Sequence, residues 1–171
     1  MRLRLAAAKA RRKLKAAPGV CNNQAILSQA DISLNGSLRE LERLAAAVAD
    51  FCAENTLDDE AEFQLNLVLE ELFVNAVRHG GCEGMTDAAR VQLRSAPDGV
   101  AVEFRDRGRP FDPSGAPEAD IHAPLAARQG GGLGIHLVRE IMRDIYYVRD
   151  GEWNVTRMRR DARRKSQGVT Q

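Results

Sequence analysis

The sequence predicts an α/β two-layer sandwich, in which helices cover one face of a mixed, mainly antiparallel sheet. Two long segments between residues 38 and 79 repeat apolar side chains at helical spacing. Shorter segments before and after them alternate apolar and polar residues, as half-buried strands do. The predicted order is strand, helix, helix, hairpin, irregular segment, helix and hairpin. Antiparallel strands with helices packed on one side would give the two layers.

The first helix is predicted from its N-terminal signal. A short alternating segment, Ala30–Leu34, predicts a strand. It is followed by Ser37-x-x-Glu40, which is a capping box, and apolar residues then recur at helical spacing as far as Glu54. The first strand is therefore expected to lead directly into the first helix.

The second helix is predicted to be long and largely buried. A second capping box, Thr56-x-x-Asp59, places its start near Leu57, and Gly80 ends it. Two apolar lines would bury most of its surface. These lines are Phe63, Leu67, Val74 and Val77, and Leu65, Leu69, Leu72 and Ala76.

The later part of the chain is predicted to form two hairpins and a third helix. Turn sequences mark the hairpins, and renewed apolar spacing after a run of glycines marks the helix. Residues 108–132 show no periodicity, which is typical of a lid or a disordered insertion. The predicted segments are Arg90–Ser95 and Val100–Asp106 around Pro97-Asp98-Gly99, the helix from Ile135 to Ile145, and Tyr146–Arg149 and Trp153–Met158 around Asp150-Gly151.

Composition indicates one domain in a reducing compartment. The chain has 171 residues, 44% of them hydrophobic, which is enough for a sizeable core. No apolar run approaches the roughly 20 residues that a membrane-spanning helix needs, so no membrane association is predicted. Cys21, Cys52 and Cys82 are odd in number and show no CxxC spacing. This pattern argues against a disulfide framework or a cysteine zinc site, and it favours the cytoplasm.

Charge is segregated along the chain. Residues 1–20 carry seven Lys or Arg and no acid, whereas residues 21–156 carry 23 acidic and 12 basic side chains. We expect residues 1–27 to be a flexible basic leader, residues 28–158 to form the domain, and residues 159–171 to be a disordered basic tail. A basic terminus can touch nucleic acid or anionic lipid. We interpret the C-terminal tail as solvated and expect no direct contact with nucleic acid. We assign no function to the leader.

A polar stripe interrupts the apolar surface of the second helix. At about 100° per residue, Glu71, Asn75 and Arg78 fall on one narrow line between apolar neighbours. A carboxylate and a carboxamide in such a setting are partly removed from water, so a polar group is expected to meet them. By itself, such a pair is more often a satisfied polar contact in the core or the wet edge of a helix.

Two further motifs have ligand-binding chemistry. Gly130–Gly134, with the sequence GGGLG, opens a helix, where free backbone N–H groups can approach an anion. Asp106-Arg107-Gly108 ends a predicted strand, where an acid can accept a hydrogen bond from a ligand that glycine allows to come close. Alone, the first motif could be a hinge and the second an ordinary turn.

In this order, the three motifs resemble those of the Bergerat-type (GHKL) ATP-binding superfamily, which includes gyrase, histidine kinases and mismatch-repair ATPases. The resemblance covers roughly residues 28–158. Within this superfamily, the chain is most similar to the anti-sigma factor serine/threonine-protein kinases of bacterial partner-switching systems. Glu71–His79 is similar to that family's N box, Asp106–Pro113 to its first glycine box, and Gly130–Gly134 to its second.

The resemblance implies a role for each motif residue. Asn75 would ligate Mg²⁺ through its carboxamide oxygen, and Glu71 would be the general base. Asp106 would accept a hydrogen bond from the adenine amino group, with Gly108 leaving room for the ring. The other ATP contacts that it implies are Arg78, His79, Arg128, Gly130, Gly131, Gly132, Leu133 and Gly134.

The resemblance also implies a function and partners. The chain would be an ATP-dependent serine kinase that phosphorylates a STAS-type anti-sigma-factor antagonist, and an anti-sigma factor that sequesters a sigma factor. The resemblance also implies a homodimer. The presence of Glu71 at the base position favours the kinase. The alternative is a nucleotide-dependent protein-binding module, or ATP sensor, without phosphoryl transfer. A detached histidine-kinase catalytic domain is disfavoured, because no helical segment with a phosphoacceptor histidine precedes residue 28.

Overall fold

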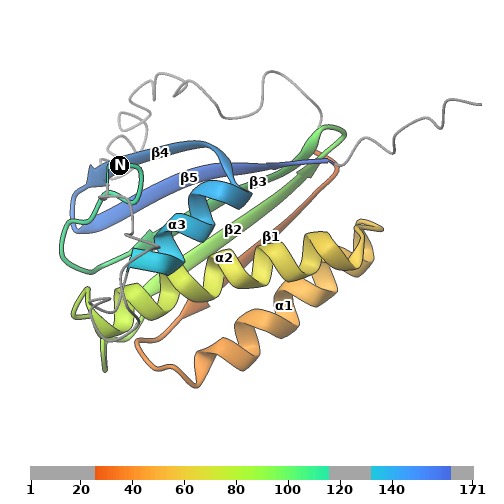
Figure 1. Ribbon diagram of the computed structural model, residues 1–171. Helices are drawn as coiled ribbons and strands as arrows, with labels where there is room; N and C mark the ends of the chain where they lie inside the picture. Colours follow the sequence, from red (N-terminus) through yellow and green to blue (C-terminus); the bar gives the residue numbers. More distant parts are fainter. Residues whose placement is uncertain (1–25, 116–131, 163–171) are drawn as a thin grey trace, which may run out of the picture.

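The computed structural model describes residues 26–115 and 132–162 (Figure 1). The predictions for most of the leader, for Arg128, Gly130 and Gly131, and for residues 163–171 lie outside this part of the chain. The described elements are β1 (Ser28–Leu34), α1 (Glu40–Glu54), α2 (Asp59–Arg78), β2 (Ala89–Ala96), β3 (Gly99–Asp106), α3 (Gly132–Ile141), β4 (Arg143–Asp150) and β5 (Trp153–Asp161).

The five strands form one open sheet in the order β1-β2-β3-β5-β4, and the three helices pack against one face of it (Figure 1). This arrangement confirms the predicted two-layer α/β fold. The sheet was predicted to be mixed, but every pairing between the described strands is antiparallel. Strand β3 lies at the centre, between β2 and β5.

The core lies between the sheet and the helices. Alternate residues of the central strands are buried, with Val91 of β2 opposite Phe104 of β3 and Leu93 opposite Val102. This is the period of two expected for a sheet with one buried face. The helices contribute the other half of the core, chiefly Leu44, Val48 and Phe51 of α1, Leu65, Val68, Leu69 and Phe73 of α2, and Ile135 and Val138 of α3.

Both predicted capping boxes are wrong in detail. Helix α2 begins at Asp59, and its N-cap is Asp58, whose Oδ1 accepts a hydrogen bond from the Ala61 backbone N–H at 2.8 Å. Thr56 has a φ of 54°, so it belongs to the turn before the helix. Helix α1 begins only at Glu40 and has no side-chain cap. In both loops, residues that the sequence motif had assigned to the helix belong to the preceding turn instead.

Three further expectations are corrected. Phe63 is 65% exposed, and the buried face of α2 is completed by Val68 and Phe73. Ile145 lies in β4, because α3 ends at Ile141. Strand β5 continues to Asp161, so residues 159–161, which were placed in the tail, pair with β3.

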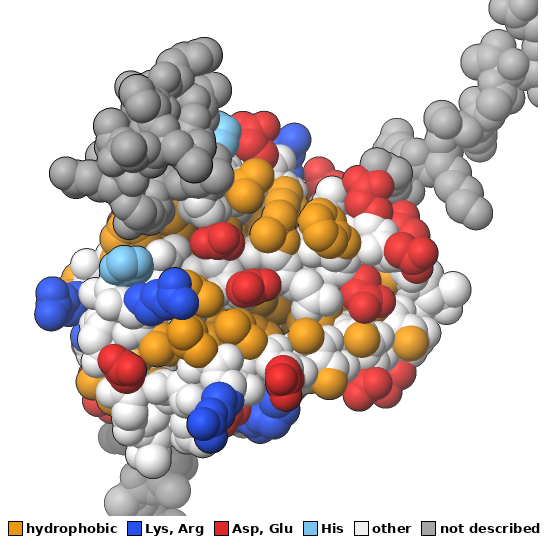
Figure 2. Space-filling view, turned by 60° about the horizontal axis from the view of Figure 1, so that its bottom comes forward, with side chains coloured by type: hydrophobic (Ala, Val, Ile, Leu, Met, Phe, Trp, Pro, Cys, Tyr) orange, Lys and Arg blue, Asp and Glu red, His pale blue; other side chains and the backbone are white. Residues whose placement is uncertain are grey.

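The outer face of the helical layer is acidic. Figure 2 shows Asp and Glu side chains around an apolar strip that runs along this face. Glu42 and Asp50 of α1 and Glu70 of α2 are among the exposed acids. Across the part of the chain that is described, no helix combines the length and the apolar character needed to cross a bilayer.

Candidate functional site

A cavity of about 380 Å³ lies between the C-terminal half of α2 and the adjoining ends of β3 and β5. We call the α2 side the helix wall and the β3–β5 side, with the loop after β3, the strand wall. Described residues line it on both sides: Leu72, Asn75, Ala76, His79 and Gly80 on the helix wall, and Phe104, Asp106, Arg109, Pro110, Phe111, Asn154 and Thr156 on the strand wall.

The strand wall presents one carboxylate, that of Asp106. This residue ends β3 and lies directly opposite Asn154 of β5. Its Oδ1 accepts two hydrogen bonds, each 2.8 Å long, from the Gly108 backbone N–H and from Nδ2 of Asn154. Burial raises the pKa of the Asp106 carboxyl, and these two donors act in the opposite direction. Asp106, which is predicted to contact adenine, therefore lines the cavity, and its Oδ1 already accepts hydrogen bonds from the protein.

Glycine is required at position 108 because the loop passes very close to the end of α2. A Cβ there would lie 2.7 Å from Oδ1 of Asp106 and 3.1 Å from the Gly80 Cα. The next residue, Arg109, donates its backbone N–H to the Gly80 carbonyl at 2.9 Å. The glycine predicted to give room to a ligand thus also allows the close approach of loop and helix.

Asn154 is the main residue of the strand wall that the sequence did not reveal. It is 3% exposed, and its Nδ2 donates to Asp106 Oδ1 and to the carbonyls of Arg109, at 2.9 Å, and of Gly108, at 3.3 Å. Its Oδ1 accepts from the Tyr147 hydroxyl and from Nη1 of Arg149, both at 2.8 Å. The only available signal was the predicted strand alternation, which places Asn154 and Thr156 on one face with Met158. Nothing in that pattern identifies their partners.

The helix wall contains a polar group without a partner. Nδ2 of Asn75 is buried, and no hydrogen bond to it is found among the described residues. The backbone carbonyl of Asn75 is occupied, because it accepts from the N–H groups of His79 and Gly80. An unpaired buried N–H costs free energy, so Nδ2 has a hydrogen bond to offer to a group in the cavity.

This position fits a magnesium ion that arrives with a phosphate ligand. Magnesium prefers oxygen ligands and usually takes few of them from the protein, and the Asn75 carboxamide carries one such oxygen beside the cavity. Within residues 26–115 and 132–162, no cluster of three His, Cys, Asp or Glu side chains is suited to a metal. Among the described residues, the protein ligand that the sequence predicts for such an ion is Asn75, and oxygens of the phosphate ligand and water would complete its shell.

Glu71 lies one helical turn before Asn75, against the start of α3. It is half-buried, and a Cβ on Gly134 would overlap its carboxylate. Glycine at position 134 therefore leaves the space that this carboxylate occupies. Glu71 itself is not among the residues that line the cavity. Of the predicted glycine run, Gly132, Leu133 and Gly134 form the first turn of α3.

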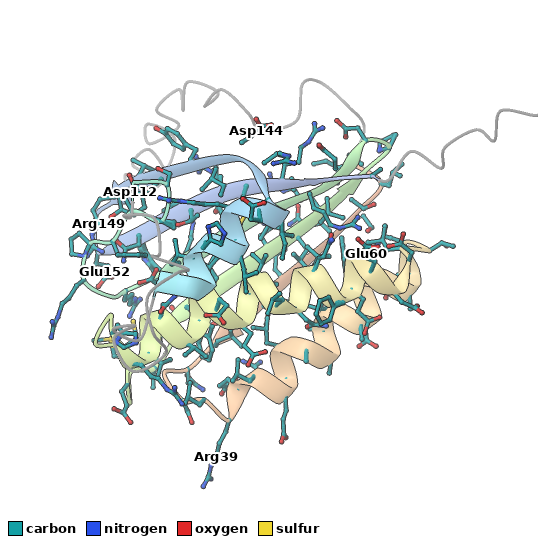
Figure 3. The ribbon with its side chains drawn as sticks, viewed as in Figure 1. Arg39, Glu60, Asp112, Asp144, Arg149 and Glu152 are labelled. Carbon is teal, nitrogen blue, oxygen red and sulfur yellow. The ribbon has the colours of Figure 1, made fainter. Side chains whose placement is uncertain are left out.

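The structure does not bring every predicted site residue to the cavity. His79 lines it, but Arg78 lies in a separate groove with Gly36, Arg39 and Glu83. Arg39 extends away from the body of the molecule at the start of α1, and Arg149 lies at the end of β4 (Figure 3). The polar stripe predicted on α2 is thus divided, with Asn75 directed to the cavity and Arg78 to the outside.

The fold belongs to a known family. Residues 34–160 match the family model of the histidine kinase-like ATPase domain, so the chain belongs to this family. This match confirms the resemblance to the GHKL superfamily predicted from the three motifs. The family assignment implies that the protein binds ATP.

Two relatives refine the comparison. The serine/threonine-protein kinase BtrW of Bordetella bronchiseptica is 32% identical to this chain over 92 residues, which are 54% of this chain and 65% of BtrW. The match thus spans slightly less than two thirds of that relative. Among solved structures, the RsbU and RsbW domains of Rv1364c from Mycobacterium tuberculosis match with a TM-score of 0.58 and 16% identity, over 80% of this chain and 33% of that one. The second match concerns the fold alone.

Proposed function

We propose that this protein is a cytoplasmic, ATP-dependent serine kinase and anti-sigma factor of the partner-switching type. It transfers the γ-phosphoryl group of ATP to a serine of a STAS-type anti-sigma-factor antagonist, and it sequesters a sigma factor. The name of the Bordetella relative supports a serine/threonine kinase. The assignment of the partners rests on the resemblance of Glu71–His79, Asp106–Pro113 and Gly130–Gly134 to the motifs of that family.

The observation that carries the proposal is the pairing of two polar groups across one cavity. Asp106 on the strand wall and the unpartnered amide of Asn75 on the helix wall face a space of about 380 Å³. The intervening surface is apolar and includes Leu72 and Phe104. A nucleotide has the matching shape, because its flat base suits the apolar surface and Asp106, and its charged end suits Asn75.

Two side chains of α2 have separate roles in the proposed reaction. Asn75 would hold Mg²⁺ with its carboxamide oxygen, and the ion would supply positive charge to neutralise the phosphates. Glu71, one turn earlier, accepts the proton of the serine hydroxyl as that oxygen bonds to the γ-phosphorus, while the bond from this phosphorus to the bridging oxygen breaks and ADP leaves. The contact between Glu71 and Gly134 supports this role, because it keeps the carboxylate at the end of α3 that follows the glycine run.

One observation favours the second candidate, a nucleotide-dependent binding module without phosphoryl transfer. The carboxylate of Glu71 rests against Gly134 and is not part of the cavity lining. If it stays there when ATP is bound, the protein can bind nucleotide and partner without activating a hydroxyl group.

The two candidates are separated by assaying phosphoryl transfer and ATP binding on the same variants. The full-length protein is incubated with Mg²⁺, labelled ATP and a panel of STAS-type antagonists, and phosphoserine is identified by mass spectrometry. We expect Glu71→Gln to lower the transfer rate at least about 100-fold, as the loss of a general base does, with ATP affinity nearly unchanged. Glu70→Gln is the matched control, because Glu70 is an exposed neighbour on the same helix.

The outcomes are distinct. Transfer that survives Glu71→Gln would remove Glu71 from the catalytic role. ATP binding without phosphoserine on any antagonist of the panel would leave the binding module as the function. A protein that fails to bind ATP in the presence of Mg²⁺ would refute both candidates.

A further inference from the structure

Asn154 connects the Asp106 carboxylate to the loop that follows it. Its Nδ2 has two hydrogens, and its two shortest contacts are Oδ1 of Asp106 at 2.8 Å and the Arg109 carbonyl at 2.9 Å. These acceptors lie on either side of Gly108. One buried amide therefore sets both the rotation of the carboxylate and the path of the loop.

The orientation of the Asn154 amide is itself determined by β4. Arg149 has only hydrogen-bond donors, and its Nη1 donates to Oδ1 of Asn154 and to the Gly108 carbonyl, both at 2.8 Å. The Tyr147 hydroxyl donates to the same Oδ1. A rotated amide would direct its NH₂ group at the Arg149 guanidinium, so only the observed orientation satisfies both side chains.

This arrangement leaves one particular oxygen of Asp106 for a ligand. Both hydrogen bonds that the described residues donate to this carboxylate go to Oδ1, from Gly108 and from Asn154. The other oxygen, Oδ2, receives none from this part of the chain. Since Asp106 lines the cavity, Oδ2 is the acceptor that remains available there.

We propose that Asn154, oriented by Tyr147 and Arg149, is a positioning residue that fixes the Asp106 carboxylate so that Oδ2 is the acceptor left for a ligand, and that it thereby makes the cavity selective for adenine over guanine. This inference rests on the proposed binding of ATP and adds the origin of base selectivity. The Asn154 side chain acts through Asp106, and only Asp106 meets the base.

The selectivity follows from donor and acceptor chemistry. The amino group of adenine donates a hydrogen bond to a carboxylate oxygen, whereas guanine presents a carbonyl oxygen at the same ring position and is repelled. Because Oδ1 already accepts two bonds, a proton taken up by Asp106 goes to Oδ2 and turns this acceptor into a donor. A donor at that place disfavours adenine and admits guanine.

The titration of Asp106 gives the proposal a second readout. Burial raises the pKa of Asp106, and the hydrogen bond from Asn154 is the largest influence that lowers it. Loss of that donor moves the loss of ATP binding on acidification to a higher pH. The other charged or titratable groups near Asp106 are His79, Cys82, Arg109 and Arg149, and they remain in the Asn154 variant.

The test measures the affinities of the full-length protein for Mg²⁺-ATP and Mg²⁺-GTP by calorimetry over a range of pH. We expect Asn154→Ala to weaken ATP binding about tenfold or more and to reduce the ratio of ATP to GTP affinity, as expected when a positioned hydrogen bond is lost. The pH midpoint for loss of ATP binding should rise. Tyr147→Phe, which removes one hydroxyl only, should shift the ratio and the midpoint in the same direction by a smaller factor.

The matched control is Tyr146→Phe, because Tyr146 is the neighbouring tyrosine of β4 and is 38% exposed. It should change neither the ratio nor the midpoint. If Tyr147→Phe and a folded Asn154→Ala both keep the wild-type ratio and midpoint, the positioning role is refuted while ATP binding stands. If the wild-type protein binds no ATP, the proposed function itself fails. Should Asn154→Ala not fold, Tyr147→Phe alone decides the question.

Discussion

The two walls of the cavity differ in how their polar groups are satisfied. On the strand wall, Asp106 and Asn154 are held by hydrogen bonds from the protein, including those from Tyr147 and Arg149. On the helix wall, the buried amide of Asn75 has no partner among the described residues. The polar groups of the strand wall are fixed in place by the described residues, with Oδ2 of Asp106 left as an acceptor, whereas the buried amide nitrogen of the helix wall has no partner among them.

This difference indicates where the free energy of ligand binding arises. A preorganised wall gives selectivity, because its groups do not rearrange when the ligand arrives. An unpartnered buried amide is a cost to the free protein that a ligand removes. The strand wall is therefore expected to support the stability of the fold, and the helix wall to be coupled to binding.

The largest expected effect comes from making the same substitution on each wall. Asn154→Leu should lower the free energy of unfolding by about 3 kcal/mol, because it leaves several buried partners unpaired. Asn75→Leu should change it by less than about 0.5 kcal/mol, since the amide that it removes is already unsatisfied. Urea unfolding measures both variants, and calorimetry should show that Asn75→Leu nevertheless abolishes Mg²⁺-dependent ATP binding. Equal losses of stability would end the distinction between the walls.

A smaller effect is expected where the two walls touch. Gly108→Ala places a Cβ against the Gly80 backbone, and such overpacking should cost about 2 kcal/mol in urea unfolding and weaken ATP binding. Gly115→Ala is the control, because a Cβ there meets only the Asp112 carboxylate at 3.5 Å, an ordinary contact. An alanine tolerated equally at both positions would show that the approach of loop and helix is not tight.

The smallest effect is a dependence of stability on pH with opposite signs at two aspartates. Burial raises the pKa of Asp106, so its contribution to stability declines as pH rises from the unfolded value of 3.8 through the raised folded value. Hydrogen bonds from Arg90 and Ser33 lower the pKa of Asp87 to about 2, so Asp87 stabilises the fold above pH 3.8 and loses this contribution as pH falls to about 2.

Substitution by asparagine at each position measures these two contributions. As pH rises from about 2 to 3.8, Asp87→Asn should lose stability relative to the wild type, and as pH rises further, through the raised folded pKa of Asp106, Asp106→Asn should gain it. Urea unfolding between pH 2 and pH 7 provides the comparison. A common sign for both variants would show that burial does not dominate at Asp106.

Parts of this site were predictable because they depend on local spacing. Glu71 and Asn75 lie one turn apart on any helix, and an acid followed by glycine at a strand end is visible without a fold. Asn154 was not predictable in this way, because its contact with Asp106 joins residues 48 positions apart. That contact exists only when β5 pairs with β3 in the observed register.

Helix packing places the polar residues of α2 at different sites, which their spacing in the sequence did not show. Asn75 and Arg78 lie on one predicted stripe, yet α2 packs so that the first lines the cavity and the second lies in a separate groove. Phe63 was expected in the core and is exposed. A helix with apolar residues on most of its surface can bury any of several faces. Which face is buried depends on the elements packed against the helix.

The amino-acid sequence by itself determined the fold class, the order of the elements and the three motifs, because hydrophobic periods and turn chemistry act over a few residues. Only the tertiary structure decided which oxygen of Asp106 accepts hydrogen bonds from the protein, which amide donates one of them and which polar residues of α2 line the cavity. These features depend on strand register and helix packing, which are set by contacts between distant parts of the chain.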